Sequence, residues 1–233
     1  MNGRQYWQRI AVSTMLALVV VMVGGASVYA DEYDCTTGVT PPSTVDNLRA
    51  PPGHTCVLDG THVEGAIQVE DNATLRAYDV RVDGNIQSEG GLLIDISDGS
   101  RVEGNVQADN VGRVNIHPGC FVGGSIQIKE SGAAAIDGVE VDSDILFDTN
   151  DRPLIARNTT VGGNLQAFQN TGGVLIAYNT IDGNLQCNSN APPPTGGGNV
   201  VHGSMEDQCA GFDRAPTSPP DMPYRTYLAP LRK

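Results

Sequence analysis

Apolar residues recur along the chain in a short motif that returns every 19 or 20 residues. The motif reads Val-x-Gly-x-Ile-Gln, as in Val82-Asp-Gly-Asn-Ile-Gln87 and Val102-Glu-Gly-Asn-Val-Gln107. Its third position falls at Gly65, Gly84, Gly104, Gly124, Ser143, Gly163, Gly183 and Gly203. A unit of this length is too short for a helix pair and lacks a 3.6-residue period, so it predicts short strands separated by turns.

The two apolar positions of the motif lie four residues apart, and we expect both to point to one side of an extended segment. A second apolar pair follows about ten residues later, as in Ile94 and Ile96 or Val114 and Ile116. One unit cannot bury these residues alone, but units stacked at ~4.8 Å bury them together. The sequence therefore predicts an all-β fold, a single-stranded parallel β-helix of about eight coils. We expect a right-handed coil, because the six-residue rhythm of left-handed β-helices is missing.

The polar residues of the motif have structural explanations. Glycine at the third position permits a left-handed backbone or a close approach between coils. Stacked asparagine and glutamine side chains can form hydrogen-bonded ladders. The predicted ladder residues are Asn85, Asn105, Asn164 and Asn184, and Gln68, Gln87, Gln107, Gln127, Gln166 and Gln186. We interpret both sets as structural ladders and not as an active site.

Residues 1–30 have the pattern of a secretory signal peptide. Arg4 and Arg9 precede an apolar stretch from Ile10 to Val23, and the small residues at Val28 and Ala30 suit a signal peptidase. We expect cleavage after Ala30, which makes the protein secreted and leaves no membrane span in the mature chain.

The chain is acidic, with a formal net charge of −13 that becomes −15 once Arg4 and Arg9 are removed. A surface of this charge repels nucleic acid and anionic lipid, so neither is an expected partner. Cell-surface proteins or glycans are the expected partners, and the sequence leaves the oligomeric state open.

Four of the five cysteines lie near the ends of the repeat array, where a solenoid needs caps. Cys35 and Cys56 are 21 residues apart, and Cys187 and Cys209 are 22 apart, so each pair is separated by about one coil. In a secreted chain this spacing predicts the disulfides Cys35–Cys56 and Cys187–Cys209. We expect an N-terminal cap with a degenerate first coil over residues 31–62 and β-helix repeats with a C-terminal cap over residues 63–211.

Cys120 is left over, three residues after His117. We expect Cys120 to be a buried thiol. The two alternative hypotheses are a nucleophilic cysteine activated by a nearby histidine and an intermolecular disulfide. Residues 212–233 are rich in proline and are expected to form a disordered tail or a linker.

Two groups of acidic residues could carry chemistry. Stacked coils would place Glu64, Asp83 and Glu103 in one column that could hold calcium, but His62, Arg81 and Arg101 precede them by two residues. Alternating charges of this kind predict cross-strand ion pairs without a metal.

The degenerate coil from residue 141 to 160 is rich in carboxylates: Asp142, Asp144, Asp148 and Asp151. It is the candidate for a calcium site, although the spacing differs from that of a calcium-binding loop. A solvated irregular coil without a metal is the preferred interpretation, and no other cofactor is expected.

The function expected from these observations is a structural or binding module that presents a rigid polar surface to proteins or glycans. An enzyme acting on polysaccharide is the first alternative, but such an enzyme needs a groove between two carboxylates, and repeats this short leave no room for long loops. A self-assembling extracellular filament is the second alternative.

The coil motif and the C-terminal segments Pro194-Thr-Gly-Gly-Gly-Asn199 and Gln208-Cys-Ala-Gly211 resemble those of a group of uncharacterised secreted bacterial β-helix proteins. The resemblance covers about Cys35 to Gly211. It implies an exported bacterial solenoid with no established activity or catalytic residue. More distantly, the Val-x-Gly-x-Ile coils are similar to those of bactofilins, cytoplasmic β-helices that polymerise end to end. The predicted signal peptide and the cysteines depart from the bactofilin pattern.

Overall fold

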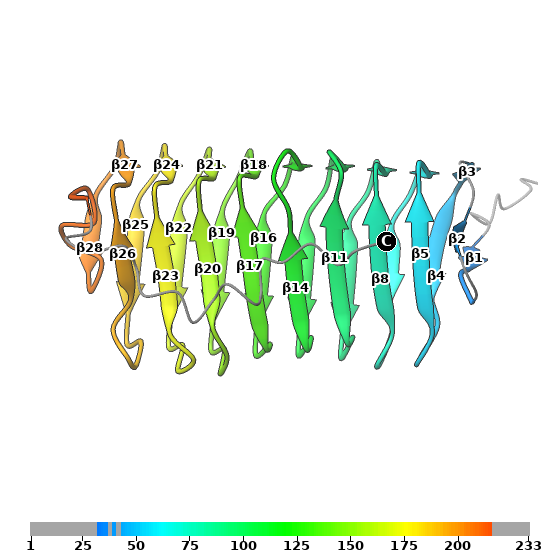
Figure 1. Ribbon diagram of the computed structural model, residues 1–233, viewed down its shortest axis with the longest axis horizontal. Helices are drawn as coiled ribbons and strands as arrows, with labels where there is room; N and C mark the ends of the chain where they lie inside the picture. Colours follow the sequence, from blue (N-terminus) through cyan, green and yellow to red (C-terminus); the bar gives the residue numbers. More distant parts are fainter. Residues whose placement is uncertain (1–31, 37–38, 41–42, 216–233) are drawn as a thin grey trace, which may run out of the picture.

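A computed structural model describes residues 32–36, 39–40 and 43–215 of the chain. Over these residues the chain winds into coils that follow one another along a single long axis (Figure 1). The strands form three parallel sheets, and the described residues contain no helix. The predicted all-β solenoid of about eight coils is confirmed, and the hand of the coil stays a prediction.

Each complete coil contributes one strand to each sheet. Sheet A consists of β1 (Glu32–Asp34), β4 (Asn47–Ala50), β7 (Ile67–Val69), β10 (Ile86–Glu89), β13 (Val106–Asp109), β16 (Ile126–Lys129), β19 (Ile145–Asp148), β22 (Leu165–Phe168), β25 (Leu185–Asn188) and β28 (Met205–Asp207). Sheet B consists of β2 (Val39–Thr40), β5 (Thr55–Asp59), β8 (Thr74–Tyr78), β11 (Leu93–Ser97), β14 (Arg113–Ile116), β17 (Ala133–Asp137), β20 (Leu154–Arg157), β23 (Val174–Ala177) and β26 (Thr195–Gly197). Sheet C consists of β3 (Thr44–Val45), β6 (His62–Val63), β9 (Arg81–Val82), β12 (Arg101–Val102), β15 (Phe121–Val122), β18 (Glu140–Val141), β21 (Thr160–Val161), β24 (Thr180–Ile181) and β27 (Val200–Val201).

Strands of neighbouring coils pair in the register that the repeat predicts. On sheet A, Ile86 lies between Ile67 and Val106, and on sheet C, Val102 lies opposite Val82. These partners are one repeat apart in the sequence. Side chains of the same kind therefore stack above one another, and the inward ones fill a continuous core.

One detail of the sequence interpretation is wrong. Val82 and Ile86 do not lie on one extended segment, because Val82 ends β9 on sheet C and Ile86 begins β10 on sheet A. The chain turns a corner between them, and both side chains still reach the core with an exposed fraction of 0%. Over so few residues, a period of two does not distinguish a straight strand from a corner that keeps two side chains inside.

At this corner, glycine in most coils allows the close approach of neighbouring coils. A Cβ atom on Gly84 would lie 2.6 Å from the carbonyl oxygen of Gly65, and one on Gly104 would lie 2.6 Å from that of Gly84. Neither Gly84 nor Gly104 has a positive φ angle. Of the two explanations offered by the sequence, close approach is the correct one.

The corners between sheets A and B use a left-handed residue instead. Thr149 (φ 58°) and Gln169 (φ 56°) are examples, and each is followed by a buried asparagine, Asn150 or Asn170. The left-handed residue redirects the chain at the end of a strand of sheet A. This conformation is unfavourable for a β-branched residue such as Thr149, so the surrounding coils must hold it in place.

Asn150, Asn170 and Asn190 form a ladder inside the rod. The Oδ1 atom of Asn170 accepts two hydrogen bonds from Asn150, one from the backbone N–H at 3.0 Å and one from the Nδ2 group at 2.8 Å. The Nδ2 group of Asn170 donates to Oδ1 of Asn190 at 2.8 Å and to the carbonyl oxygen of Phe147 at 3.1 Å. These side chains thus satisfy backbone groups at a corner that would otherwise bury unpaired donors and acceptors.

Both predicted disulfides are present. The Cα atoms of Cys35 and Cys56 are 5.4 Å apart, and those of Cys187 and Cys209 are 5.3 Å apart. Disulfides form and persist in oxidising surroundings, so the two bonds indicate an extracellular environment.

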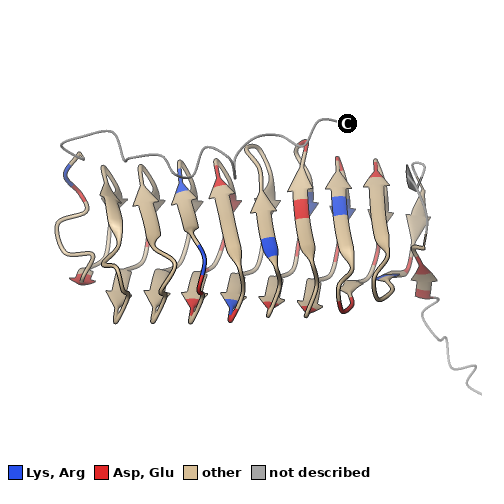
Figure 2. Cartoon of the chain, turned by 60° about the horizontal axis from the view of Figure 1, so that its bottom comes forward, with Lys and Arg blue, Asp and Glu red and all other residues tan. Residues whose placement is uncertain are grey.

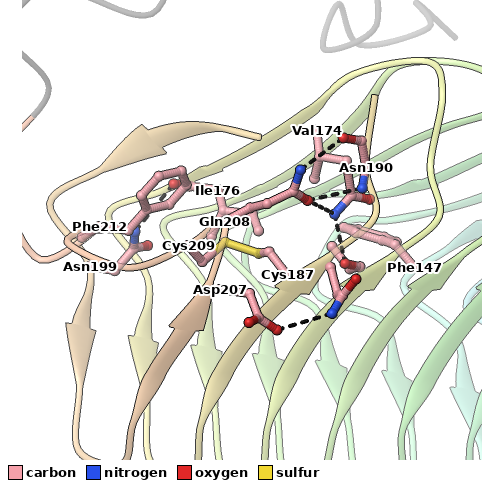
Figure 3. The surroundings of a disulfide bond; sticks show 12 residues. Phe147, Val174, Ile176, Cys187, Asn190, Asn199, Asp207, Gln208, Cys209 and Phe212 are labelled. Atoms are coloured by element: carbon pink, nitrogen blue, oxygen red, sulfur yellow. Dashed lines mark hydrogen bonds between the residues drawn. A yellow bond between two sulfur atoms is a disulfide. The ribbon is translucent and has the colours of Figure 1, made fainter. Parts of the chain in front are cut away.

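The C-terminal end of the rod is covered by the turn that follows β28 (Figure 3). Gln208 ends the buried ladder, since its Oε1 atom accepts the backbone N–H of Asn190 at 2.9 Å. Phe212 packs against the core, and its carbonyl oxygen accepts the backbone N–H of Asn199 at 3.0 Å. The described chain runs to Ala215, beyond the boundary expected from the sequence.

The predicted signal peptide and residues 216–233 of the predicted tail lie outside the described residues. In the described part of the chain there is no helix of the length and hydropathy that a membrane span requires.

Candidate binding surface

The outer face of sheet A carries a column of amide side chains, called here the glutamine column. Its members are Gln68, Gln87, Gln107, Gln127, Gln166 and Gln186, and Leu146 occupies the same position in the degenerate coil. Gln87 donates from Nε2 to Oε1 of Gln107 at 2.7 Å, and Gln166 donates to Gln186 at the same distance. The predicted glutamine ladder is confirmed for these pairs. Stacked amides hold one another in a fixed geometry while their outer edges face solvent.

A surface depression of about 420 Å³ lies over the glutamine column in the N-terminal half of the rod. Its lining residues are Gln68, Gln87, Ser88, Glu89, Gln107, Ala108, Asp109, Gln127 and Lys129. Glu89, Asp109 and Lys129 are register partners at the ends of three successive strands. The depression thus combines amide donors and acceptors with two carboxylates and one ammonium group. This chemistry suits a ligand rich in hydroxyl groups.

The predicted ion pairs are found beside sheet C. Asp83 accepts from His62 Nε2 at 3.0 Å and from Arg81 Nε at 2.8 Å. Glu103 lies 3.1 Å from Arg81 and 2.7 Å from Arg101. The hydrogen bond from His62 lowers the pKa of Asp83, and the one from Arg101 lowers the pKa of Glu103.

The arginine pairs of this charge ladder lie in the N-terminal half of the rod, and near the C-terminal end the same column holds only the pair of His202 with Asp182 at 2.9 Å within the described residues. Glu64 follows β6 and is exposed, and the column continues past Arg101 to Phe121, whose ring lies 3.6 Å from the guanidinium carbon of Arg101. From residue 158 to residue 205, Asp182 is the single residue among Asp, Glu, Lys and Arg. Figure 2 shows the corresponding strands almost without charge. The two halves of the rod therefore offer different surfaces to a partner.

The four aspartates of the degenerate coil lie at separate points around it. Asp142 follows β18 on sheet C, Asp148 ends β19 on sheet A, and Asp151 lies in the turn before β20. Asp144 occupies the position that Asn105 and Asn164 hold in the neighbouring coils of the predicted asparagine ladder, and its Oδ1 atom accepts the backbone N–H of Asn164 at 2.6 Å. Among the residues that the structure describes, no three His, Cys, Asp or Glu side chains come close enough to hold a metal ion. Calcium binding by this coil stays an untested alternative to the solvated coil without a metal.

Cys120 is buried, with an exposed fraction of 2%, and its thiol donates to the carbonyl oxygen of Ile96 at 3.6 Å. Burial raises the pKa of the thiol. Cys120 directly follows a left-handed residue, Gly119, at the corner between sheets B and C. A protonated, enclosed thiol is a poor nucleophile, which supports the structural interpretation.

His117 is half-buried and is directed to Asp95 instead of Cys120. Its Nε2 atom lies 2.9 Å from Oδ1 of Asp95, and this hydrogen bond raises the pKa of His117. Asp137 lies in the next coil and binds Arg157 at 2.8 Å. The sequence analysis missed the His117–Asp95 pair. The signal was available, because their separation of 22 residues is one coil plus a shift of two along the strand.

Comparison with known proteins adds no family to this description. No protein family model, curated protein or solved structure matches the chain. The resemblances to exported bacterial β-helix proteins and to bactofilins therefore stay predictions.

Proposed function

We propose that this protein is an exported, non-enzymatic binding module that presents the glutamine column to glycans at the cell surface. The observation that carries the proposal is the column itself, a linear array of amide groups at a repeat of ~4.8 Å. The hydrogen bonds between Gln87 and Gln107 and between Gln166 and Gln186 preorganise the array. Binding then orders few side chains, which lowers its entropic cost.

The linear form of the array favours a polymer over a small ligand. Equivalent amides recur from coil to coil, so an extended chain with a regular repeat can engage several of them at once. Each contact is weak, but linked contacts reinforce one another through effective concentration. Glu89 and Asp109 flank the column, and the chain as a whole is acidic, so an uncharged polysaccharide is the favoured ligand over an anionic one.

A panel of immobilised neutral polysaccharides, probed with the mature chain, tests the proposal. The variant Gln107→Leu removes one amide from the centre of the column, and Leu146 shows that the column accepts leucine. We expect binding to at least one polysaccharide and a loss of about tenfold or more in Gln107→Leu. Thr160→Val, on the outer face of sheet C, is the matched control and should bind like the wild type. Equal binding by Gln107→Leu and wild type would refute the role of the column.

A second candidate function, an enzyme acting on polysaccharide, has one observation in its favour. Glu89 and Asp109 are register partners that line the same depression, as a pair of catalytic carboxylates would. Both side chains are exposed, whereas a general acid needs surroundings that retain its proton near neutral pH. Release of new reducing ends from a bound polysaccharide, abolished in Glu89→Gln, would favour the enzyme over the binding module.

The filament alternative makes a different prediction. In the structure the turn over residues 208–214 covers the C-terminal end of the core, where another rod would have to stack. The binding module should therefore be a monodisperse monomer in light scattering. Growth with concentration would favour the filament instead.

A further inference from the structure

Two apolar side chains interrupt the polar outer face of sheet A in neighbouring coils. Leu146 lies in β19 and Phe168 ends β22, and both are partly exposed. Leu146 and Gln166 are register partners, so Phe168 lies two residues further along the strand in the next coil. Alternate residues of a strand face the same way, and both side chains therefore point away from the core. Leu146 and Phe168 are called here the apolar pair.

The repeat places polar residues at these positions in the other coils from β10 to β25. The positions equivalent to Leu146 belong to the glutamine column. The positions equivalent to Phe168 form a second outward column, which holds Glu89, Asp109, Lys129, Asp148 and Asn188. Diagonal neighbours on one face of a sheet lie about 7–8 Å apart, within reach of an aromatic side chain. The two departures from the repeat therefore form one apolar surface.

The apolar pair adjoins the depression over the glutamine column. Gln127 and Lys129 line the depression in β16, the last coil that it reaches, and Leu146 is the register partner of Gln127 in the next coil. Strands β16, β19 and β22 lie side by side in sheet A (Figure 1). Leu146 continues one column of the depression, and Phe168 continues the other. A ligand that extends from the depression towards the C-terminal end of the rod therefore meets the apolar pair next.

We propose that the apolar pair packs against the C–H face of a pyranose ring and selects flat polysaccharides, in which β-1,4 linkages extend the chain as a ribbon. This inference rests on the function proposed above and names the class of glycan. A pyranose ring with equatorial hydroxyl groups carries them along its edge and presents C–H groups on its two faces. It is matched by amides and carboxylates beside an apolar surface, the combination that ligand sites commonly use. The ring of Phe168 supplies a large apolar area for this contact.

The straight course of the rod favours an extended glycan over a helical one. The coils follow one another along a single axis (Figure 1). One unit of a β-1,4-linked chain is about as long as the ~4.8 Å step between coils, so successive sugar rings meet the amides of successive coils. A chain of α-1,4-linked glucose curves into a helix and leaves a straight column after a few units. The coils around Phe168 also suit an uncharged ligand, because Asp182 is the single residue among Asp, Glu, Lys and Arg from residue 158 to residue 205.

Calorimetric titration of the mature chain with soluble hexasaccharides tests the proposal. The probes are the β-1,4-linked hexamers of glucose, mannose and xylose, and the α-1,4-linked hexamer of glucose. We expect at least one β-1,4-linked hexamer to bind about tenfold or more tightly than the α-1,4-linked one. Equal or tighter binding of the α-1,4-linked hexamer would overturn the preference for flat chains.

The double variant Leu146→Gln with Phe168→Asn removes the apolar pair. It gives each position the residue that the next coil carries there, Gln166 or Asn188, so the fold already accepts these side chains in this environment. We expect it to bind the preferred hexamer about tenfold or more weakly than the wild type. Leu146→Gln alone completes the glutamine column and serves if the double variant fails to fold. It should also bind more weakly, whereas tighter binding would show that the leucine merely interrupts the column and would overturn the proposal.

Two further variants serve as controls. Tyr178→Asn removes an exposed aromatic side chain from the corner between sheets B and C, where Asn158 holds the same position in the preceding coil. It should bind like the wild type. Phe168→Tyr keeps an aromatic ring in the apolar pair and should also bind like the wild type. A loss in Phe168→Tyr as large as in the double variant would overturn the contact with the ring face.

The same titrations separate this inference from the proposed function. If the double variant binds as tightly as the wild type while Gln107→Leu loses binding, the apolar pair has no role and the glutamine column remains the binding surface. If the wild type binds none of the hexamers and none of the neutral polysaccharides, the inference and the proposed function are both overturned.

Discussion

The buried asparagine ladder gives a prediction whose size follows from the contacts. In Asn170→Ala, the backbone N–H of Asn150 loses its acceptor in a place that water does not reach. An unsatisfied buried donor costs about 1–3 kcal/mol. The carbonyl oxygen of Phe147 and Oδ1 of Asn190 each lose a hydrogen bond at about 1 kcal/mol. We therefore expect the free energy of unfolding to fall by about 3–5 kcal/mol.

Two comparison variants separate the ladder from generic effects. Asn170→Ser should cost roughly half as much, on the order of 2 kcal/mol, because a hydroxyl can still accept the N–H of Asn150. Ser131 occupies the same column and accepts the N–H of Val111 at 3.1 Å. Gln166→Ala removes an amide of similar size from the outer face, where water replaces the lost hydrogen bond, and should cost about 1 kcal/mol or less.

Guanidinium unfolding followed by circular dichroism measures the three variants against the wild type. The variants are compared by the guanidinium concentration at the unfolding midpoint, provided that the slope of the unfolding free energy against denaturant is the same for all. This condition is needed because a stack of repeats can depart from two-state unfolding. Asn170→Ala should have the lowest midpoint and Gln166→Ala the highest of the three. Equal midpoints for Asn170→Ala and Gln166→Ala, or a serine variant as unstable as the alanine variant, would refute the role assigned to the ladder.

Further predictions follow from other contacts. The hydrogen bond from Asp95 raises the pKa of His117 above its ordinary value of 6.5, so the folded state binds this proton more tightly. The resulting stabilisation is complete at pH values below 6.5 and is lost as the pH rises through the higher folded value, so His117→Gln should lower the unfolding midpoint more at about pH 5.5 than at about pH 8.5. An equal or larger effect at the higher pH would contradict the pairing. Cys120 should react with a thiol reagent at least a hundredfold more slowly in the folded protein than in denaturant, and comparable rates would show that it is accessible. Cys187→Ala with Cys209→Ala should lower the free energy of unfolding by about 3 kcal/mol, because the bond closes a loop of 22 residues. An unchanged unfolding midpoint would mean that this disulfide contributes little to the stability of the protein. From the separate positions of the four aspartates in the degenerate coil, we expect millimolar calcium to leave the midpoint unchanged, and a calcium-dependent rise would restore the metal hypothesis.

Much of the fold was predictable because the repeat fixes the neighbours of each residue. Once the third motif position recurs at a constant spacing, the pairing of Val82 with Val102 and the meeting of Cys187 with Cys209 follow directly. The ion pair between Arg81 and Glu103, which lie in neighbouring coils, was predictable for the same reason.

Features that depend on the path within a coil were less accessible. The corner between Val82 and Ile86 preserves the inward direction of both side chains, so the apolar pattern does not reveal it. The buried ladder through Asn170 was missed although Asn150, Asn170 and Asn190 recur every 20 residues, because a single asparagine after a strand looks like an ordinary turn residue. Its members become recognisable once residues one coil apart are compared.

The candidate site was predictable only as a set of ladders. The glutamine column follows from the repeat, but the depression beside it depends on side chains at the ends of strands, such as Glu89 and Lys129. The repeat alone does not specify the depth or the shape of the depression.

Stacking in register can be tested in the middle of the rod, away from the native disulfides. Gln107 and Gln127 are register partners on the outer face of sheet A, and adjacent strands lie ~4.8 Å apart, within the range that a disulfide bridges. Oxidation of the double variant Gln107→Cys with Gln127→Cys should therefore give an intramolecular bond in nearly every molecule. The pair Gln107→Cys with Gln186→Cys spans four coils and should give none. The reverse result, or bonding in neither variant, would contradict the stacked coils.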